Sequence, residues 1–268
     1  MSLFTKLDQT QRDTLARLRD LRLTGFADGL MLQWDTPSVY IDMSFEDRLR
    51  DLIAQQEDDR RDARAAYLLK TSNIKRALEF EDILVNPDRG FTLKLKKELA
   101  SLRFINSITN VMVQGASGAG KSSLIQALGR LCCRQGYSVK YSNANDLLSS
   151  LKNSDYSTKT KLRERLKRCK VLILDDLGLH PLGEELGLEL FNLLEDREKV
   201  GPVIVGTQLR DQGLVKAIGG RRETIDAVMR RLTQGSIKVE LRGDAYSMAS
   251  VEHAINQNTT NKEEKNHD

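Results

Sequence analysis

The stretch Val111-Met-Val-Gln-Gly115-Ala-Ser-Gly-Ala-Gly120-Lys121-Ser122 decides the fold of this chain. Its last eight residues match the pattern G-x-x-x-x-G-K-[ST] without a mismatch. The apolar run that precedes the pattern predicts a strand, and the leucine spacing that follows it predicts a helix starting near Lys121. Strand, glycine-rich loop and helix in this order form a phosphate-binding loop, so the sequence predicts a nucleotide-binding α/β domain.

Each residue type in this loop has a physical reason to be there. Glycines allow backbone N–H groups to curl around phosphates, and the helix N-terminus adds donors and partial positive charge. We expect Lys121 to bridge the β- and γ-phosphates of ATP and the Ser122 hydroxyl to bind Mg²⁺. The predicted nucleotide-binding residues are Gly115, Ala116, Ser117, Gly118, Ala119, Gly120, Lys121, Ser122 and Ser123.

A second motif, Val171-Leu-Ile-Leu-Asp175-Asp176, is a buried-strand pattern that ends in two acids. Such a strand tip beside the phosphate loop predicts Asp175 as a second magnesium ligand. Asp176 is then the catalytic base that orients and deprotonates the attacking water. Many ATPases of this type have Glu at this position, and the shorter Asp favours slower hydrolysis. Alternatively, Asp176 only caps the turn that follows.

A third apolar strand, Val203–Gly206, ends in Thr207 and Gln208. In a sheet of this kind its tip lies next to the acidic strand tip, so Thr207 or Gln208 can hydrogen-bond the γ-phosphate or the attacking water. The alternative is a polar strand end without a catalytic role.

Three segments organise the chain. The pattern of residues 1–75 predicts a small all-helical N-terminal domain for docking to a partner or to DNA. Within it, Ser44 is a predicted helix cap, and Gly25 and Gly29 interrupt a short apolar stretch. Residues 76–250 predict a P-loop ATPase domain in which helices flank a five-stranded parallel sheet. Residues 251–268 are polar and predict a disordered tail. The predicted strands are Val111–Gln114, Ser138–Ser142, Val171–Leu174, Val203–Gly206 and Ile237–Leu241, and the helices between them begin near Lys121, Asn145, Gly183 and Asp226.

Basic charge is concentrated in residues 151–170. Eight Lys and Arg residues face only two acids there, a surplus of six that exceeds the chain's net charge of +4. Tyr156 lies among them and can stack on a base. A cluster of this kind predicts salt-sensitive contact with a nucleic-acid backbone, and the alternative is a solvated helix face. The predicted DNA-binding residues are Lys152, Tyr156, Lys159, Lys161, Arg163 and Arg165.

Composition excludes several other classes of protein. Charged residues make up 30% and hydrophobic residues 40% of the chain, as in globular proteins. No apolar run reaches the roughly 18 residues that a membrane span needs, and the polar N-terminus has no signal-peptide core. The three cysteines lack metal-ligand spacing and agree with a reducing compartment, so we expect a cytoplasmic protein.

With these motifs placed, the chain resembles the IstB family, the AAA+ ATPase helpers of insertion-sequence transposases. The phosphate-binding loop and the strand that ends in Asp175 and Asp176 are the two Walker motifs, A and B, and they occur in many ATPases. Their combination with this N-terminal region is more specific. The resemblance rests on the segments Leu21–Ala27, Ser44–Leu49, Ala77–Asp82, Arg134–Val139, Ala144–Leu148, Leu172–Gly178 and Asp226–Leu232.

The resemblance implies properties that the spacing of residues does not show. The family is related to the helicase loader DnaC and to the initiator DnaA. Its members oligomerise on duplex DNA with ATP at subunit interfaces, and they present DNA to the transposase and stimulate it. Arg231 matches the arginine of the family's D-R-L motif and is the implied arginine finger. Two alternatives stay open, a DnaC-like helicase loader and a P-loop enzyme that does not bind DNA, such as a small-molecule kinase.

Overall fold

The computed structural model describes residues 7–243 and divides the chain into two compact units, which meet between Tyr67 and Leu68. This division falls earlier than the predicted boundary at residue 75, because Leu68, Leu69 and Ile74 pack against the core of the second unit. The predicted tail, 251–268, lies outside the described residues. The first helices are α1 (Gln9–Asp20), α2 (Thr24–Asp35), α3 (Pro37–Tyr40) and α4 (Phe45–Thr71).

Close packing of helices holds the N-terminal unit together. Helix α2 continues through Gly25 and Gly29, the two glycines that interrupt the apolar stretch in the sequence. A Cβ atom on Gly25 would lie 2.7 Å from the Gln55 carbonyl oxygen of α4. Glycine is therefore needed for the close approach of the two helices rather than for a turn. The predicted cap is present, since the Ser44 hydroxyl accepts the N–H of Asp47 at 3.1 Å.

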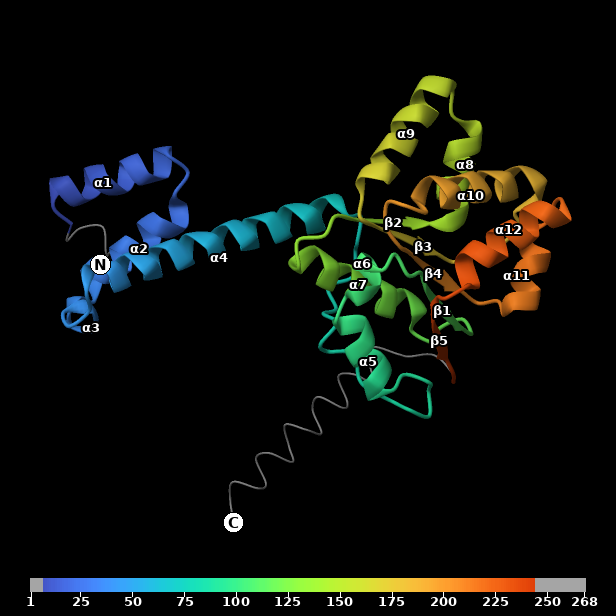
Figure 1. Ribbon diagram of the computed structural model, residues 1–268, viewed down its shortest axis with the longest axis horizontal. Coiled ribbons are helices and arrows are strands. Elements are labelled where there is room, and N and C mark those ends of the chain that lie inside the picture. The colour runs from blue at the N-terminus through green and yellow to red at the C-terminus, as the bar shows by residue number, and fades with distance from the viewer. Residues whose placement is uncertain (1–6, 244–268) are drawn as a thin grey trace, which may run out of the picture. The chain divides into compact units, whose positions relative to one another are not determined.

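The second unit contains a parallel five-stranded sheet in the order β2-β3-β4-β1-β5, as Figure 1 shows. This confirms the predicted fold class. Strand ends lie within one residue of the prediction, but the helix expected near Asp226 begins four residues earlier. The elements are α5 (Leu93–Ala100), α6 (Arg103–Asn106), β1 (Val111–Gly115), α7 (Lys121–Arg134), β2 (Val139–Asn143), α8 (Ala144–Asn153), α9 (Tyr156–Arg168), β3 (Val171–Asp175), α10 (Gly183–Arg197), β4 (Val203–Thr207), α11 (Asp211–Ile218), α12 (Arg222–Thr233) and β5 (Ile237–Leu241).

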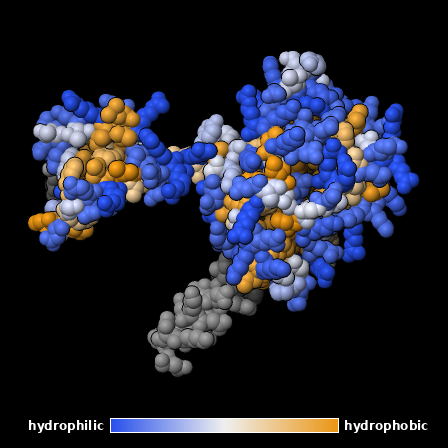
Figure 2. Space-filling model, in the orientation of Figure 1, coloured by the Kyte–Doolittle hydropathy of each residue, from blue (hydrophilic) through white to orange (hydrophobic). Residues whose placement is uncertain are grey.

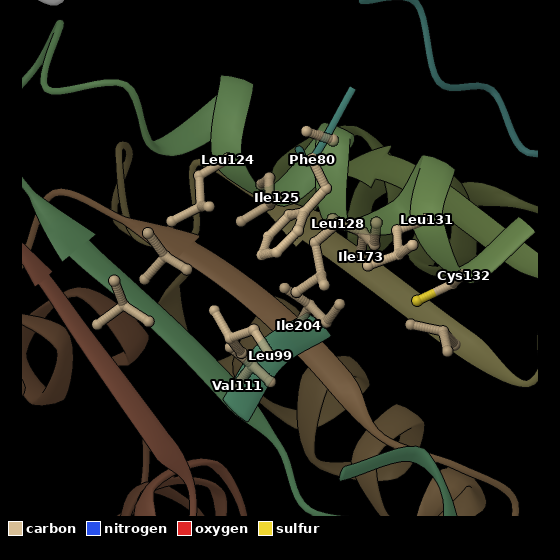
Figure 3. Close-up of a cluster of buried hydrophobic side chains, with 14 of the residues drawn as sticks. Phe80, Leu99, Val111, Leu124, Ile125, Leu128, Leu131, Cys132, Ile173 and Ile204 are labelled. Carbon is tan, nitrogen blue, oxygen red and sulfur yellow. The ribbon is translucent and has the colours of Figure 1, made fainter. Parts of the chain in front are cut away.

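Two hydrophobic cores cover the two faces of this sheet. Alternate strand residues point to opposite faces, so Val111 and Val113 join one core and Met112 joins the other. Figure 3 shows the first core, where Leu124, Ile125 and Leu128 of α7 pack on the sheet beside Phe80 and Leu99. Helices α8, α10 and α12 each contribute buried apolar residues to the second core.

The exposed surface differs from these cores. Figure 2 shows mainly hydrophilic residues on the visible face of the second unit. Among the described residues, no helix is both long enough and apolar enough to cross a membrane. Because all strands are parallel, their carboxyl ends share one edge of the sheet, and the predicted phosphate loop, acidic pair and polar strand end lie there.

Candidate nucleotide-binding site

The loop between β1 and α7 has the geometry of a phosphate cradle. Gly118 and Gly120 adopt positive φ angles of 77° and 95°, which are strained for residues with a side chain. Lys121 starts α7 and is 5% exposed. Its ammonium donates to the Ala116 carbonyl at 2.7 Å, so the charge lies within the loop itself.

Electrostatics connect this lysine to the acidic strand tip. Burial lowers the pKa of Lys121, while the nearby carboxylates of Asp176 and Asp175 act to raise it. A buried cation is stable only near an opposite charge, and these two acids supply it in the absence of phosphates. The structure thus brings the two sequence motifs together at one site.

Hydrogen bonds and close packing that the sequence did not indicate fix the position of the Asp175 carboxylate. It is 1% exposed, and its Oδ2 accepts the phenol O–H of Tyr141 at 2.9 Å. Its Oδ1 accepts the backbone N–H of Asp176 at 3.0 Å. A Cβ atom on Gly206 of β4 would lie only 2.5 Å from Oδ1. The carboxylate therefore occupies a fitted space, and Tyr141 and Gly206 are site residues that the sequence analysis missed.

Tyr141 reaches Asp175 because β2 and β3 are neighbours in the sheet. Burial raises the pKa of Tyr141, and the adjacent Asp175 charge raises it further, so the phenol stays neutral and donates a hydrogen bond to the carboxylate. The only sequence signal for the contact of Tyr141 with Asp175 is an aromatic residue in a predicted strand, and many tyrosines with a purely structural role show the same signal.

Asp176 lies at the mouth of the site in a left-handed backbone conformation with φ of 56°. Its side chain lines the phosphate cavity together with Lys121 and Ser122. Burial raises the pKa of its carboxyl and the Asp175 charge raises it further, whereas Lys121 opposes the change. A carboxylate with a raised pKa beside the phosphate loop is a better proton acceptor than an ordinary surface Asp.

Thr207 and Gln208 occupy different environments. Thr207 is fully buried, and its hydroxyl donates to the Leu177 carbonyl at 2.7 Å and accepts the Leu209 N–H at 3.1 Å. The predicted contact of Thr207 with the γ-phosphate or water does not agree with this placement, because its hydroxyl is already engaged within the protein. Gln208 lines the phosphate cavity, so it is the polar strand end that faces the nucleotide site.

Two adjoining cavities give the site its shape. The phosphate cavity has a volume of about 390 Å³, and its lining includes two residues that the sequence analysis missed, Arg76 and Leu179. A smaller apolar pocket lies beside the loop and is lined by residues such as Leu78, Phe91 and Leu124. A polar cavity next to an apolar pocket matches a nucleotide, which has charged phosphates and a flat, apolar base.

The predicted arginine finger lies at the opposite edge of the sheet. The Arg231 carbonyl accepts the side-chain N–H of Asn110, which precedes β1, whereas the phosphate loop follows β1. The Arg231 guanidinium lies 4.8 Å from the centre of the Phe191 ring and 3.8 Å from Glu195. Arg231 therefore cannot serve the site of its own subunit. Its neighbour Arg230 is exposed, and both arginines line a second polar cavity, which lies at this opposite edge of the sheet.

Ion pairs divide the predicted DNA-binding cluster. Lys159 and Arg163 of α9 pair with Glu189 of α10, and Lys152 pairs with Glu185. These three cations are partly neutralised, which the sequence could not show because their partners lie 26 or more residues away. Among the described residues, no carboxylate pairs with Lys161, Arg165 or Arg168, all of which are exposed, and Tyr156 is 87% exposed.

Comparison with known proteins agrees with this geometry. The family model described as IstB-like ATP binding protein matches residues 16–254. The chain belongs to the IstB-like ATP-binding protein family. A relative in Pseudomonas fluorescens, the ATP-binding protein of insertion sequence IS1162, is 35% identical over 199 residues, which cover 73% of this chain and 85% of the relative. An insertion-sequence ATP-binding protein of Sinorhizobium fredii, y4pL, is 29% identical over 87% of this chain and 94% of its own length.

Solved structures show the same fold at low sequence identity. DnaI matches with a TM-score of 0.52 and 19% identity, over 68% of this chain and 93% of that structure. AMPPCP-bound DnaA from Aquifex aeolicus matches with a TM-score of 0.51 and 23% identity, over 65% of this chain and 52% of that structure. This chain thus spans about half of that DnaA structure. The predicted family, its DnaA-like fold and the P-loop ATPase class are therefore confirmed for this IstB-like ATP-binding protein.

Proposed function

We propose that this IstB-like protein oligomerises on duplex DNA with ATP and recruits and stimulates a transposase at the target site. The observation that carries this proposal is a complete phosphate-loop site in a chain whose relatives are named as ATP-binding proteins of insertion sequences. An exposed cationic face on the same unit supports contact with DNA, and a cationic cavity far from the phosphate loop supports a subunit interface.

The site fits MgATP on the evidence of its own residues. The positive φ angles of Gly118 and Gly120 let the loop backbone curl around phosphates, and the Asp175 carboxylate sits in a space that a single Cβ on Gly206 would fill. We propose that Ser122 and Asp175 hold the Mg²⁺, which neutralises phosphate charge when bound. Lys121 then stabilises the charge that develops on the phosphates. Asp176 accepts the proton of the attacking water, and Gln208 orients that water or the γ-phosphate.

The position of Arg230 and Arg231 supports ATP at a subunit interface. Both line a polar cavity of about 520 Å³ at the opposite edge of the sheet from the phosphate loop. An arginine there can stabilise transition-state charge only in the site of another subunit. Arg231 stacks on Phe191 and would have to leave that ring, whereas Arg230 is already exposed. The arginine finger is therefore one of this pair, and Arg230 needs the smaller rearrangement.

For DNA contact we propose the exposed face of α9 that contains Lys161, Arg165 and Arg168. These residues are three or four positions apart, so they share one side of the helix. Their charges are available for phosphates, whereas Lys159 and Arg163 already pair with Glu189. Tyr156, at the first turn of the same helix, is available for stacking.

The test compares two double charge reversals that change net charge equally. Lys161→Glu with Arg165→Glu removes the proposed DNA contacts, and Lys94→Glu with Lys97→Glu on the exposed surface of α5 is the matched control. Binding to a fluorescent duplex is measured by anisotropy at several salt concentrations with a slowly hydrolysed ATP analogue. Each lost phosphate contact lowers the slope of log K against log salt by about 0.9.

We expect the slope to fall by about two for the α9 variant and to change little for the control. Equal affinity and slope for the α9 variant and the wild type would place the DNA-binding surface elsewhere. Equal losses in both variants would show a general charge effect rather than a binding face.

The partner of the N-terminal unit distinguishes the proposed function from a helicase loader. The fold likeness to DnaI does not separate the two, because DnaA shares the same fold. We propose residues 1–75 as the docking region for the transposase. A pull-down with an insertion-sequence transposase, and in parallel with a replicative helicase, should retain only the transposase. Retention of the helicase alone would favour a loader.

A further inference from the structure

A short segment after α4, residues 72–76, ends at the nucleotide-binding site and is here called the strap. At one end the carbonyl of the buried Ser72 accepts the backbone N–H of Tyr141 at 2.7 Å. At the other end the N–H groups of Lys75 and Arg76 both donate to the side-chain oxygen of Gln126, each at 3.1 Å. The backbone of the strap is thus fixed to β2 and to α7, the helix that begins at the phosphate loop.

The packing between these two ends is also close. Ile74 in the middle of the strap packs against the sheet core, and a Cβ on Gly129 of α7 would lie 2.8 Å from its Cδ1. Gln126 is 5% exposed, so the two hydrogen bonds that its side-chain oxygen accepts from the strap are shielded from solvent. The strap therefore delivers the Arg76 side chain from a rigid backbone position rather than from a loose loop.

The Arg76 side chain enters the phosphate cavity. It lines that cavity together with residues of the phosphate loop and Asp176. One of its guanidinium nitrogens donates to the Ser123 hydroxyl at 3.2 Å, directly beside the predicted magnesium ligand Ser122. No carboxylate among the described residues forms an ion pair with this guanidinium, which leaves its charge available to a ligand.

The charges around the cavity bear on the class of ligand that Arg76 binds. Lys121 faces the two carboxylates of Asp175 and Asp176, so without Arg76 the acids outnumber the cations. We infer that Arg76 is a phosphate-binding residue of the ATP site, supplied by the same chain as the phosphate loop. A guanidinium presents several donors in a planar fork and binds phosphate oxygens better than an isolated ammonium does. This inference rests on ATP binding at the loop and adds a contact outside both Walker motifs.

The test measures nucleotide affinity with Arg76→Ala, Arg76→Lys and the neighbouring control Lys75→Ala. Both positions are exposed and share the Gln126 acceptor through their backbone, so all three substitutions preserve the strap. Titration with a fluorescent ATP analogue in the presence of Mg²⁺ gives Kd, and competition with ADP and adenosine separates the phosphates from the base. Thermal melting curves check that each variant is folded.

We expect Arg76→Ala to weaken ATP binding on the order of tenfold, as for loss of a charged hydrogen bond, and Arg76→Lys to fall in between. Lys75→Ala should stay within twofold of the wild type, and adenosine affinity should not change in any variant. A loss for Arg76→Ala that is less than fivefold beyond that of Lys75→Ala overturns the inference. An equal loss for adenosine also overturns it, since the pocket itself would then be altered.

Lys121→Ala separates this inference from ATP binding at the loop. If Lys121→Ala strongly weakens ATP binding while Arg76→Ala binds ATP as tightly as Lys75→Ala does, only the role of Arg76 is wrong. If Lys121→Ala binds ATP normally, the loop is not the nucleotide site, and the role of Arg76 fails with it.

Discussion

Replacing Gly206 by Ala should disable the magnesium-binding side of the ATP site while leaving the phosphate loop intact. The new Cβ would lie 2.5 Å from Oδ1 of Asp175 and 3.1 Å from Cδ1 of Ile125. A normal contact between these atoms needs at least about 3.2 Å, so the carboxylate has to move by roughly 0.7 Å. Its hydrogen bonds from Tyr141 and Asp176, at 2.9 and 3.0 Å, would then exceed the distance at which such bonds hold.

The expected changes in stability and in Mg²⁺ requirement follow from those contacts. Overpacking a close-packed interior costs about 1–3 kcal/mol, and loss of one hydrogen bond to a charged group is of the same order. We expect the free energy of unfolding to fall by about 2 kcal/mol, which lowers Tm by about 4–8 °C for a domain of this size. Misplacement of a metal-binding carboxylate should raise the Mg²⁺ concentration needed for half-maximal ATP hydrolysis on the order of tenfold.

Two assays and one control test this reasoning. Melting curves give the stability, and phosphate release at increasing Mg²⁺ gives the metal dependence. The control is Gly213→Ala in α11, where the nearest atoms are 3.3 Å away and belong to the flexible Leu209 side chain. It should be neutral or slightly stabilising, because Ala favours helix more than Gly does. A Gly206→Ala protein with wild-type Tm and wild-type Mg²⁺ dependence would refute the fitted position of Asp175.

Two further substitutions probe the neighbouring groups. Asp176→Asn should lose ATP turnover but raise Tm at neutral pH, because burial and the Asp175 charge make the ionised carboxyl unfavourable, as its raised pKa indicates, and Asn tolerates the same positive φ. This gain in stability is fully present above the folded-state pKa of Asp176, and it vanishes as the pH falls below the pKa of the unfolded state, near 3.8. An unchanged Tm at pH 7.5 would contradict the prediction. Tyr141→Phe should raise the Mg²⁺ requirement severalfold without changing the affinity for metal-free ATP, and an unaltered Mg²⁺ titration would show that Tyr141 does not position Asp175.

The sequence predicted the parts of the site that lie in continuous motifs. Gly115 to Ser122 and the pair Asp175 and Asp176 carry their chemistry in spacing alone, and the parallel sheet follows from the alternation of strands and helices. Gly206 and Tyr141 were not predicted, because their role depends on which strands are neighbours. Strand β2 borders β3, and β4 borders it on the other side, an order that spacing along the chain does not specify.

Pairing over long sequence distances explains the remaining differences. Lys159 looked available for DNA because Glu189, its partner on α10, is 30 residues away. Arg76 had no signal at all, since it lies in a short polar segment 47 residues before the Ser123 hydroxyl that it contacts. Thr207 was expected at the phosphate because polar strand ends face ligands, yet a backbone carbonyl already engages its hydroxyl.

We propose that main-chain groups and Lys121 of the loop from Gly115 to Ser122 bind the ATP phosphates. The most direct measurement is a calorimetric titration of MgATP into the wild-type protein and into Lys121→Ala. We predict saturable binding of one nucleotide per chain to the wild type, and binding roughly 100-fold weaker for the variant, because two charged phosphate contacts are lost. Equal binding isotherms for the two folded proteins would contradict the claim.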